Sequence, residues 1–345
     1  MAGRRASIRD VAALAGVSVG TVSNVLNRPD RVSATTRERV TEAVDKLGFV
    51  RNESARQLRA GNSGMIGLVV LDAGNPFFTD VASGAEQVIS EAGYSLMLAN
   101  SAEEPSREAR HLELFERIRA EGVLVSPVDA ASGALARLRE RGVPVVLVDR
   151  GAELTHECSV SVDDVAGGRL AAAHLLAQGH QRIAVVGGPA SLRQVTERRA
   201  GAQEAVAGFA DGNGRWARLE VVPTAALTIA EGRRVGTELA GRPAPERPSG
   251  IFALNDLLAL GLLQSLTLAG LRVPEDIALI GYDDIAFAAA ATIPLSSVRQ
   301  PRADLGRRAA ELLLEEVRPA ETPHVHEHVV FTPELVARAS TLGRP

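Results

Sequence analysis

Polar and aromatic side chains stand shortly after apolar runs that are typical of buried strands. We expect these side chains to be Phe77, Phe78, Asp149, Arg150, Arg198, Asn255 and Asp283. The carboxyl ends of parallel strands meet at one edge of a sheet, so these groups should converge there. Carboxylates, a guanidinium and an amide bind hydroxyl groups, and an aromatic face stacks on a sugar ring or a base. They predict a small-molecule site. The alternative for each residue is a helix cap or a salt bridge between lobes.

Motifs for catalysis are missing from the sequence. It has no G-x-S-x-G, no P-loop, no C-x-x-C, no H-E-x-x-H and no G-x-G-x-x-G, and its only lysine is Lys46. We therefore predict that the chain is not an enzyme and needs no cofactor. Cys158, the only cysteine, cannot form an internal disulfide and fits a reducing compartment.

One cluster of histidines leaves two interpretations open. His324, His326 and His328 alternate with other residues, so one strand face would carry all three imidazoles and could hold a metal. The other interpretation is a polar edge of the last strand. We favour the polar edge and predict no metal site.

The elements that must position these groups alternate between strand and helix from residue 65 onward. Apolar runs predict strands at 66–71, 95–99, 123–126, 145–149, 183–187, 219–222, 250–253 and 277–281. Helical segments such as 80–92, 135–141 and 165–178 separate most of them. This alternation indicates a parallel α/β fold, and its length favours two doubly wound lobes. The chain should cross between the lobes near 151–162, 288–298 and 319–326.

The first fifty residues predict three short amphipathic helices. Ser7 opens a capping box, and Gly16 ends the first helix. Ser18 caps a second helix over 19–26, and Ser33 caps a third. Such helices with a short turn between the first two describe an all-α helix-turn-helix head.

Charge separates the head from the rest of the chain. Residues 1–60 carry eleven basic and six acidic side chains, a net +5, whereas the remainder has 27 basic and 36 acidic side chains, a net −9. A basic head on an acidic body indicates a nucleic-acid binder with a second function. The sequence shows no apolar run long enough for a membrane span and no secretory signal, so we expect a cytoplasmic, nucleoid-associated protein without a membrane partner.

The collinear motifs resemble one known family. SIRDVAALAGVSVGTVSNVLNRPDRVSATTRERVTEAVDKLGFVRNESARQLR is similar to the head and hinge of the lactose-repressor (LacI/GalR) family. GNPFF, HLLAQGHQRIAVVGGP, ERRAG, ALNDLLALGLL, GLRVPEDIALIGYDD and VARAS follow in the family's order. The resemblance implies a transcriptional repressor that is controlled by a small-molecule effector, most simply a sugar or sugar derivative. It also implies lobes of periplasmic-binding-protein type.

The expected domains follow from these patterns. They are a helix-turn-helix domain at 1–50, a hinge helix and linker at 51–64 and a two-lobed core at 65–345. The N-terminal lobe should comprise about 65–160 and 290–319, and the C-terminal lobe about 161–289 and 320–345.

The second helix is the expected reader of double-stranded operator DNA. The resemblance assigns base readout to Val19, Gly20 and Asn24; an amide can bond adenine, and valine can press on a thymine methyl. Gly20 has no side chain for readout. We expect Thr21, Ser23, Ser33 and Thr36 to hold phosphates.

Residues 52–59 match the family's hinge helix. The resemblance implies that paired hinge helices lie in the minor groove, where Leu58 wedges between bases and Asn52 and Gln57 contact DNA. The alternative for Leu58 is packing against the core. Glu53 departs from expectation, because an acid near DNA repels unless it caps a helix.

The effector assignments rest most firmly on Asp149, Arg198 and Asp283, which match ligand-binding positions of the family. Where many relatives carry an aromatic residue, this chain has Leu227, which weakens a purine sandwich and leaves a sugar, sugar phosphate or nucleoside open. We expect a homodimer, because a palindromic operator requires two heads. The alternative class, a solute-binding protein of a transporter, lacks a DNA head. The operator sequence, the effector's identity and the sign of its effect do not follow from the residues.

The hinge assignment predicts that Leu58→Ala strongly weakens operator binding, because the wedge between the bases is lost. Effector affinity should stay nearly unchanged. Fluorescence anisotropy with labelled operator and a parallel effector titration measure both. Equal operator affinity in the variant would contradict the assignment.

Overall fold

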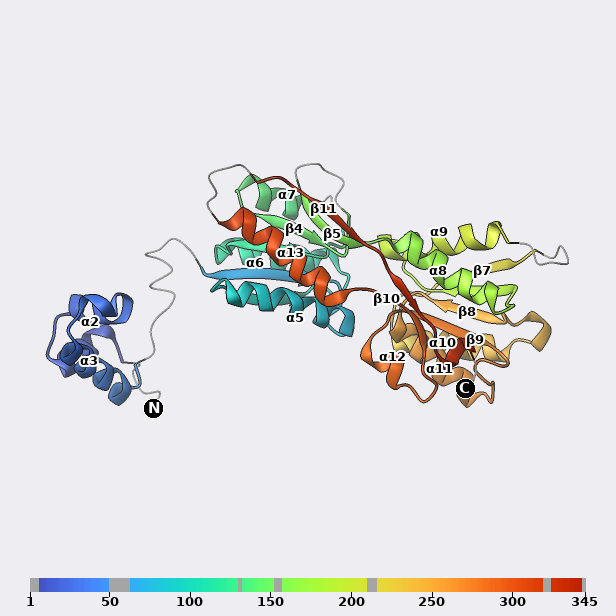
Figure 1. The fold of residues 1–345 in the computed structure, drawn as a ribbon, viewed down its shortest axis with the longest axis horizontal. Coiled ribbons are helices and arrows are strands. Elements are labelled where there is room, and N and C mark those ends of the chain that lie inside the picture. Colours follow the sequence, from blue (N-terminus) through green and yellow to red (C-terminus); the bar gives the residue numbers. More distant parts are fainter. Residues whose placement is uncertain are drawn as a thin grey trace. The chain divides into compact units, whose positions relative to one another are not determined.

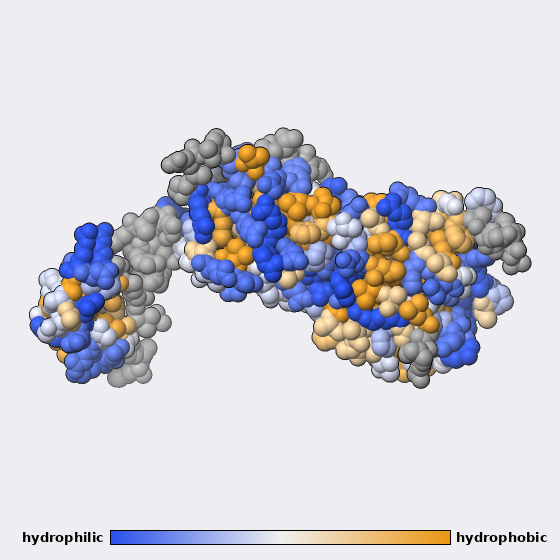
Figure 2. Space-filling model, in the orientation of Figure 1, coloured by the Kyte–Doolittle hydropathy of each residue, from blue (hydrophilic) through white to orange (hydrophobic). Residues whose placement is uncertain are grey.

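The computed structural model describes residues 6–49, 63–129, 132–151, 157–209, 216–318 and 324–342. Its backbone divides into two units, Met1–Asn62 and Ser63–Pro345 (Figure 1). On the face shown in Figure 2, the first unit is mostly hydrophilic, whereas apolar residues gather in patches over the C-terminal part of the second. Within the described residues, no helix is long and apolar enough to cross a bilayer.

The first unit is a bundle of short helices. These are α1 (Ile8–Ala15), α2 (Val19–Asn27), η1 (Pro29–Arg31) and α3 (Ala34–Leu47). The predicted capping box is confirmed, because the Ser7 amide donates to Asp10 Oδ2 at 2.8 Å while the Ser7 side chain accepts from the Asp10 amide. Gly16 ends α1 with a φ of 61°, a left-handed conformation that glycine adopts without strain. Val11, Val22 and Val40 then pack as a fully buried core.

Ser33 does not cap the third helix with its side chain as predicted. Ser33 does stand at the N-cap of α3, but its side chain makes no bond to the helix backbone. Its hydroxyl instead pairs with the Thr36 hydroxyl at 2.9 Å. The two side chains therefore satisfy each other.

The N-terminal lobe of the second unit is built on a parallel sheet in the order β11-β5-β4-β3-β1-β2. Its strands are β1 (Met65–Val70), β2 (Ser95–Asn100), β3 (Gly122–Val125), β4 (Val145–Val148), β5 (Cys158–Val162) and β11 (His328–Phe331). Its helices are α5 (Pro76–Glu91), α6 (Pro105–Arg117), α7 (Gly133–Glu140) and α13 (Arg302–Val317). Along β1, Leu68 and Val70 join the apolar cluster that contains residues of α5 and α13, and Val69 joins the cluster that contains residues of α6 and α7. This alternation is what covers both faces of the sheet.

The C-terminal lobe repeats the arrangement in the order β12-β10-β9-β8-β6-β7, with only the edge strand β12 antiparallel to its neighbour. Its strands are β6 (Arg182–Val186), β7 (Arg218–Val222), β8 (Gly250–Ala253), β9 (Ala278–Asp283), β10 (Ser296–Arg299) and β12 (Glu334–Val336). Its helices are α8 (Asp164–Ala177), α9 (Arg193–Ala207), α10 (Ile229–Gly241), η2 (Ala244–Glu246), α11 (Asp256–Leu268), α12 (Ala286–Ala290) and α14 (Ala339–Leu342). The prediction of two doubly wound lobes is confirmed.

The crossings between the lobes lie later in the chain than predicted. The chain crosses at Asp163, at Gln300–Pro301 and at Thr332–Pro333, because β5 and β11 pair in the N-terminal sheet and β10 in the C-terminal sheet. The expected lobe limits at 160, 290 and 320 are therefore corrected. Two of the three segments predicted as crossings overlap strands, β5 and β10. The observed crossing segments run side by side between the lobes (Figure 1): the Asp163 amide donates to the Phe331 carbonyl at 3.0 Å, and β10 pairs with β12.

Glycines allow α5 and α13 to pack at backbone distance. A Cβ on Gly306 would lie 1.9 Å from the Val81 carbonyl oxygen, and one on Gly84 would lie 2.1 Å from the Ala303 carbonyl oxygen. We therefore predict that Gly306→Ala lowers the free energy of unfolding by about 1–3 kcal/mol, since neither backbone can yield easily. Urea unfolding of the full-length protein measures this change.

Gly241→Ala is the matched control, because a Cβ at the end of α10 meets nothing within 4 Å. It should leave stability unchanged or raise it slightly through helix propensity. Equal stability of both variants would contradict the close packing of α5 on α13.

Candidate functional site

A cleft of about 450 Å³, counting the space open to solvent, lies where strands of both lobes end. It is lined by Leu71, Asp72, Asn75, Phe77, Phe78, Glu103, Asp149, Leu192, Gln194, Arg198, Leu227, Thr228, Asn255 and Asp283. Asp149 directly follows β4, and Asp283 is the last residue of β9. The cleft thus occupies the position at which open α/β sheets bind ligands.

The aspartates at these strand ends have left-handed backbone conformations. The φ angles are 58° for Asp149, 104° for Asp283 and 52° for Asp284. Non-glycine residues in this region are strained by roughly 1–3 kcal/mol each and cluster at functional sites. Because the backbone turns at these residues, the strands end there, and Asp149 and Asp283 line the cleft.

Arg198 lines the cleft and is held in place by a buried acid, a backbone carbonyl and an aromatic ring. Its Nε donates to Asp164 Oδ1 at 2.8 Å, its Nη1 donates to the Leu254 carbonyl at 2.8 Å, and the Tyr282 ring lies 3.8 Å from its Cζ. Burial alone would lower the pKa of Arg198, but Asp164, Tyr282 and the nearby aspartates outweigh it and raise that pKa. The guanidinium is therefore a fixed positive charge.

Asp283 joins the two lobes. Its carboxylate accepts from Gln300 Nε2 at 2.7 Å and from Asn75 Nδ2 at 3.1 Å, and Arg198 Nη1 lies 3.8 Å away. Asn75 belongs to the N-terminal lobe, and Gln300 lies on a crossing between lobes. Burial raises the pKa of Asp283, while Arg198 and these two amides oppose the shift. This one carboxyl group therefore connects Asn75 of the N-terminal lobe, Arg198 of the C-terminal lobe and Gln300 on the crossing.

Asp149 has a buried acceptor without a partner among the described residues. Its Oδ1 makes no hydrogen bond although the residue is only 8% exposed. Burial raises its pKa well above the ordinary value of 3.8, and Asp164 adds to the shift while Arg198 opposes it. A buried acceptor of this kind costs free energy until a donor reaches it. A ligand hydroxyl can supply that donor.

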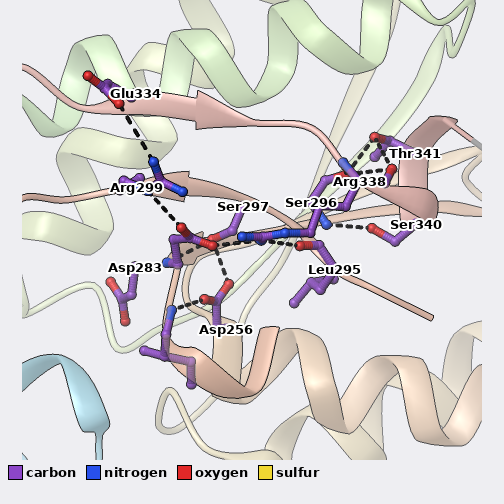
Figure 3. A network of polar contacts seen from close by, with 12 residues as sticks. Asp256, Asp283, Leu295, Ser296, Ser297, Arg299, Glu334, Arg338, Ser340 and Thr341 are labelled. Atoms are coloured by element: carbon purple, nitrogen blue, oxygen red, sulfur yellow. Dashed lines mark hydrogen bonds and ion pairs between the residues drawn. The ribbon is translucent and has the colours of Figure 1, made fainter. Parts of the chain in front are cut away.

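Beside the cleft, a polar network fastens the crossing strands to the C-terminal lobe (Figure 3). Buried Asp256 accepts from Ser297 Oγ at 2.7 Å, and Asp284 accepts from Arg299 at 2.8 Å and pairs with Arg338 at 2.6 Å. Arg302 donates to Asp80 Oδ2 at 2.8 Å and also to the carbonyls of Asp283 and Asp284. Movement at the hinge is therefore coupled to the end of β9.

The structure brings together most of the residues predicted for the effector site. Those that line the cleft are Phe77, Phe78, Asp149, Arg198, Asn255 and Asp283. Asn255 also caps α11, accepting from the Leu258 amide at 2.8 Å and donating to the Leu227 carbonyl at 3.0 Å. Arg150 is not among the lining residues, and its charge acts on buried Glu108.

The predicted set did not include Asp72, Asn75, Glu103 and Thr228, which also line the cleft. Asn75-Pro76 carries a recognisable signal, an N-cap followed by proline, and α5 begins there, four residues before the expected start at 80. Glu103 comes from a loop after β2, and its pKa is raised by burial and by Asp72.

In the head, the residues of α2 that were predicted to contact DNA lie at least partly on the helix surface. Val19, Gly20 and Asn24 are exposed, Thr21 and Ser23 are partly exposed, and Val22 and Val25 face the core. Ser18 accepts from the Thr21 amide at 3.0 Å, and the two hydroxyls lie 2.9 Å apart. Ser33 and Thr36 lie near the start of α3. The predicted DNA contacts Asn52, Gln57 and Leu58 lie outside the described residues.

Comparisons with known proteins place these features together. Residues 7–52 match the model of the bacterial regulatory proteins, lacI family, and residues 172–341 match a periplasmic binding protein-like domain. An HTH-type transcriptional repressor PurR of Aliivibrio fischeri (strain MJ11) is 33% identical over 342 residues, 98% of this chain and 99% of the relative.

Two solved structures extend the likeness to the whole fold. A transcriptional regulator CelR–cellobiose complex is 32% identical, with a TM-score of 0.69 over 97% of this chain and 100% of that one. The Lac repressor dimer bound to operator and the anti-inducer ONPF is 26% identical, with a TM-score of 0.81 over 98% of this chain and 100% of that one.

We predict that Asp149→Asn raises stability at neutral pH, because asparagine removes a buried charge. The raised pKa of Asp149 means that its charged form opposes folding above the ordinary value of 3.8. Below that value the carboxyl group is protonated in both folded and unfolded protein. The advantage of the variant should thus vanish in acid and grow as pH rises. Melting temperatures across this range measure it.

Exposed Glu275→Gln, in the same unit, is the control and should show no such trend. If Asp149→Asn instead loses stability as pH rises, the charged carboxylate is stabilised by Arg198, and the assignment of an uncompensated acceptor is wrong.

Proposed function

The chain belongs to the LacI family of bacterial regulatory proteins, and from this premise we propose that its effector is a neutral sugar bound in the cleft between the lobes. The protein is a DNA-binding transcriptional repressor with a small-molecule-binding core. The proposal adds which residues bind the effector and what charge the effector carries.

The observation that carries the proposal is the acidity of the cleft. Among the described residues, its lining includes the acids Asp72, Glu103, Asp149 and Asp283 and a single cation, Arg198. That cation is already paired with Asp164. A phosphate group would meet this excess of negative charge in a partly desolvated space, which is strongly unfavourable. Sugar phosphates and nucleotides are therefore disfavoured.

The remaining groups suit a polyol. Asp149 Oδ1, which has no partner among the described residues, can accept a hydrogen bond from a ligand hydroxyl group. Thr228 and Gln194 add polar groups to the lining. Phe77 and Phe78, whose ring centroids lie 4.9 Å apart, supply an apolar wall. Leu227 lines the opposite lobe with an aliphatic side chain, which supports a sugar over a stacked purine. The CelR structure is a complex with cellobiose, in keeping with this class of ligand.

Control of DNA binding would follow from lobe closure. The effector would replace or reinforce the Asn75–Asp283 bond, and Gln300 and Arg302 would transmit the change along the crossing strands. An effector shifts this equilibrium only by its difference in affinity for the two lobe arrangements. We propose that a homodimer presents two α2 helices to a palindromic operator in the cytoplasm, and that the cleft binds its ligand without transforming it.

The test is a thermal-shift screen with neutral mono- and disaccharides, their phosphates, nucleosides and purines, because a ligand of the native state raises the melting temperature. We expect hits among neutral sugars, and operator anisotropy then gives the sign of the response. Asp283→Ala should abolish that response without harming DNA binding in the absence of effector, while the control Glu275→Ala responds normally. A sugar phosphate, nucleoside or purine as the sole hit would overturn the proposal, as would an unchanged response of Asp283→Ala.

A further inference from the structure

Four metal-binding side chains meet in the N-terminal lobe, away from the effector cleft. They are Cys158, the first residue of β5, Glu316 in the last turn of α13, and His324 and His326, which precede β11. Each offers one donor atom, and these atoms all lie within 4.8 Å of one another. Cys158 therefore meets donors that lie more than 150 residues later in the chain.

Four of the six distances between the donor atoms are close to those of a tetrahedron around one ion. Cys158 Sγ lies 3.1 Å from His324 Nε2 and 3.6 Å from His326 Nδ1. Glu316 Oε1 lies 3.5 Å from His324 Nε2 and 3.6 Å from His326 Nδ1. Bonds of about 2.0–2.3 Å to Zn²⁺ in tetrahedral geometry require donor separations of roughly 3.3–3.6 Å. All four distances join the same four donor atoms, Cys158 Sγ, Glu316 Oε1, His324 Nε2 and His326 Nδ1.

Burial makes this arrangement costly without an ion. Cys158 is fully buried, and the side chains of Glu316 and His324 are only 15% and 14% exposed. Glu316 Oε1 is buried, belongs to the cluster and has no hydrogen-bond partner in the part of the chain that the structure describes. A carboxylate in that position needs a positive charge or a donor.

The surroundings resemble the outer shell of a metal site. Glu315 Oε2 lies 3.6 Å from Nδ1 of His324, the ring nitrogen that faces away from the cluster. The Glu327 amide donates to Cys158 Sγ at 3.4 Å, and Arg308 pairs with both Glu315 and Glu327. Carboxylates behind histidine ligands orient the rings of bound metal sites.

We propose that Cys158, Glu316, His324 and His326 bind one transition-metal ion, with Zn²⁺ as the best match. Thiolate and imidazole donors select Zn²⁺ and similar ions over Ca²⁺ and Mg²⁺, which require oxygen ligands. A thiolate, a carboxylate and two neutral imidazoles balance the charge of a divalent ion. Because four protein donors complete the coordination, the site is structural and fastens α13 and the start of β11 to β5.

The structure corrects the strand face that the sequence suggested for the histidine cluster. A strand face with three imidazoles does not form, because β11 begins only at His328, which is exposed and takes no part. The proposed set is completed by Glu316, at the end of the preceding helix, and by Cys158, which is far away in the sequence.

The experiment uses full-length protein without an affinity tag, reduced and stripped of metal, and titrates it with Co²⁺ and then Zn²⁺. We expect one Co²⁺ per chain, with visible d–d bands of a tetrahedral site, a thiolate-to-cobalt charge-transfer band, and displacement by Zn²⁺. Zn²⁺ should also raise the melting temperature.

Variants separate a metal site from a hydrogen-bonded cluster. Cys158→Ser and His326→Ala should lower the affinity for Co²⁺ by more than about a hundredfold, and Glu315→Gln should lower it by roughly ten- to a hundredfold. His328→Ala is the matched control and should bind as the wild type does. Circular dichroism without metal confirms that each variant folds. Absence of the charge-transfer band in the wild type, or equal binding by Cys158→Ser and His328→Ala, would overturn the proposal.

Discussion

The buried carboxylate of Asp283 is the group on which the two-lobed core depends. It ends the central strand β9 in a left-handed conformation and accepts bonds from both the N-terminal lobe and the hinge. Arg198, itself fixed by Asp164, compensates part of its charge. Removing water from such a carboxylate is costly, so its partners must be in place whenever the lobes are together. Of these hydrogen bonds, the one from Asn75 joins the N-terminal lobe directly to the C-terminal lobe. Opening the cleft breaks this bond, and a ligand hydroxyl can replace it.

This arrangement explains why the cleft is both specific and switchable. Asp149 has an acceptor with no protein donor among the described residues, and Asp283 accepts a hydrogen bond from the hinge residue Gln300. Occupation of the cleft therefore changes hydrogen bonding at the crossing strands, whose positions are fixed on the other side by Asp256, Asp284 and Arg338. Burial raises the pKa values of Asp149 and Asp283, so the charged forms of both carboxyl groups oppose folding.

The sequence predicts those features that a local pattern determines. All eight predicted strands form with limits close to the predicted ones; six are almost wholly buried, whereas the edge strands β2 and β7 are partly exposed. The strand-end rule then places Asp149 and Asp283 in the cleft. In contrast, β5 and β10 overlap segments that the sequence predicts as crossings between the lobes. Ser159, Ser161, Ser296 and Ser297 interrupt the apolar pattern of these strands, although all four are buried in the structure. Long-range partners satisfy the hydroxyl groups of Ser296 and Ser297, which bond to Thr341 and Asp256 respectively. Glu103 and the Cys158 cluster escape sequence reasoning for the same reason.

The proposed metal site and the effector cleft lie at opposite ends of the N-terminal sheet. Cys158 begins β5, and the other end of this strand leads into the crossing at Asp163. The amino ends of parallel strands share one edge, so the metal cluster lies at the edge where β1 starts and the chain enters the core from the head. An ion at that edge would hold β5 and β11 in register, and β5 and β11 are also the strands from which the first and third crossings leave. The hinge would then rotate about strands that are fixed at their far ends, so closure of the cleft would move the lobe as one body.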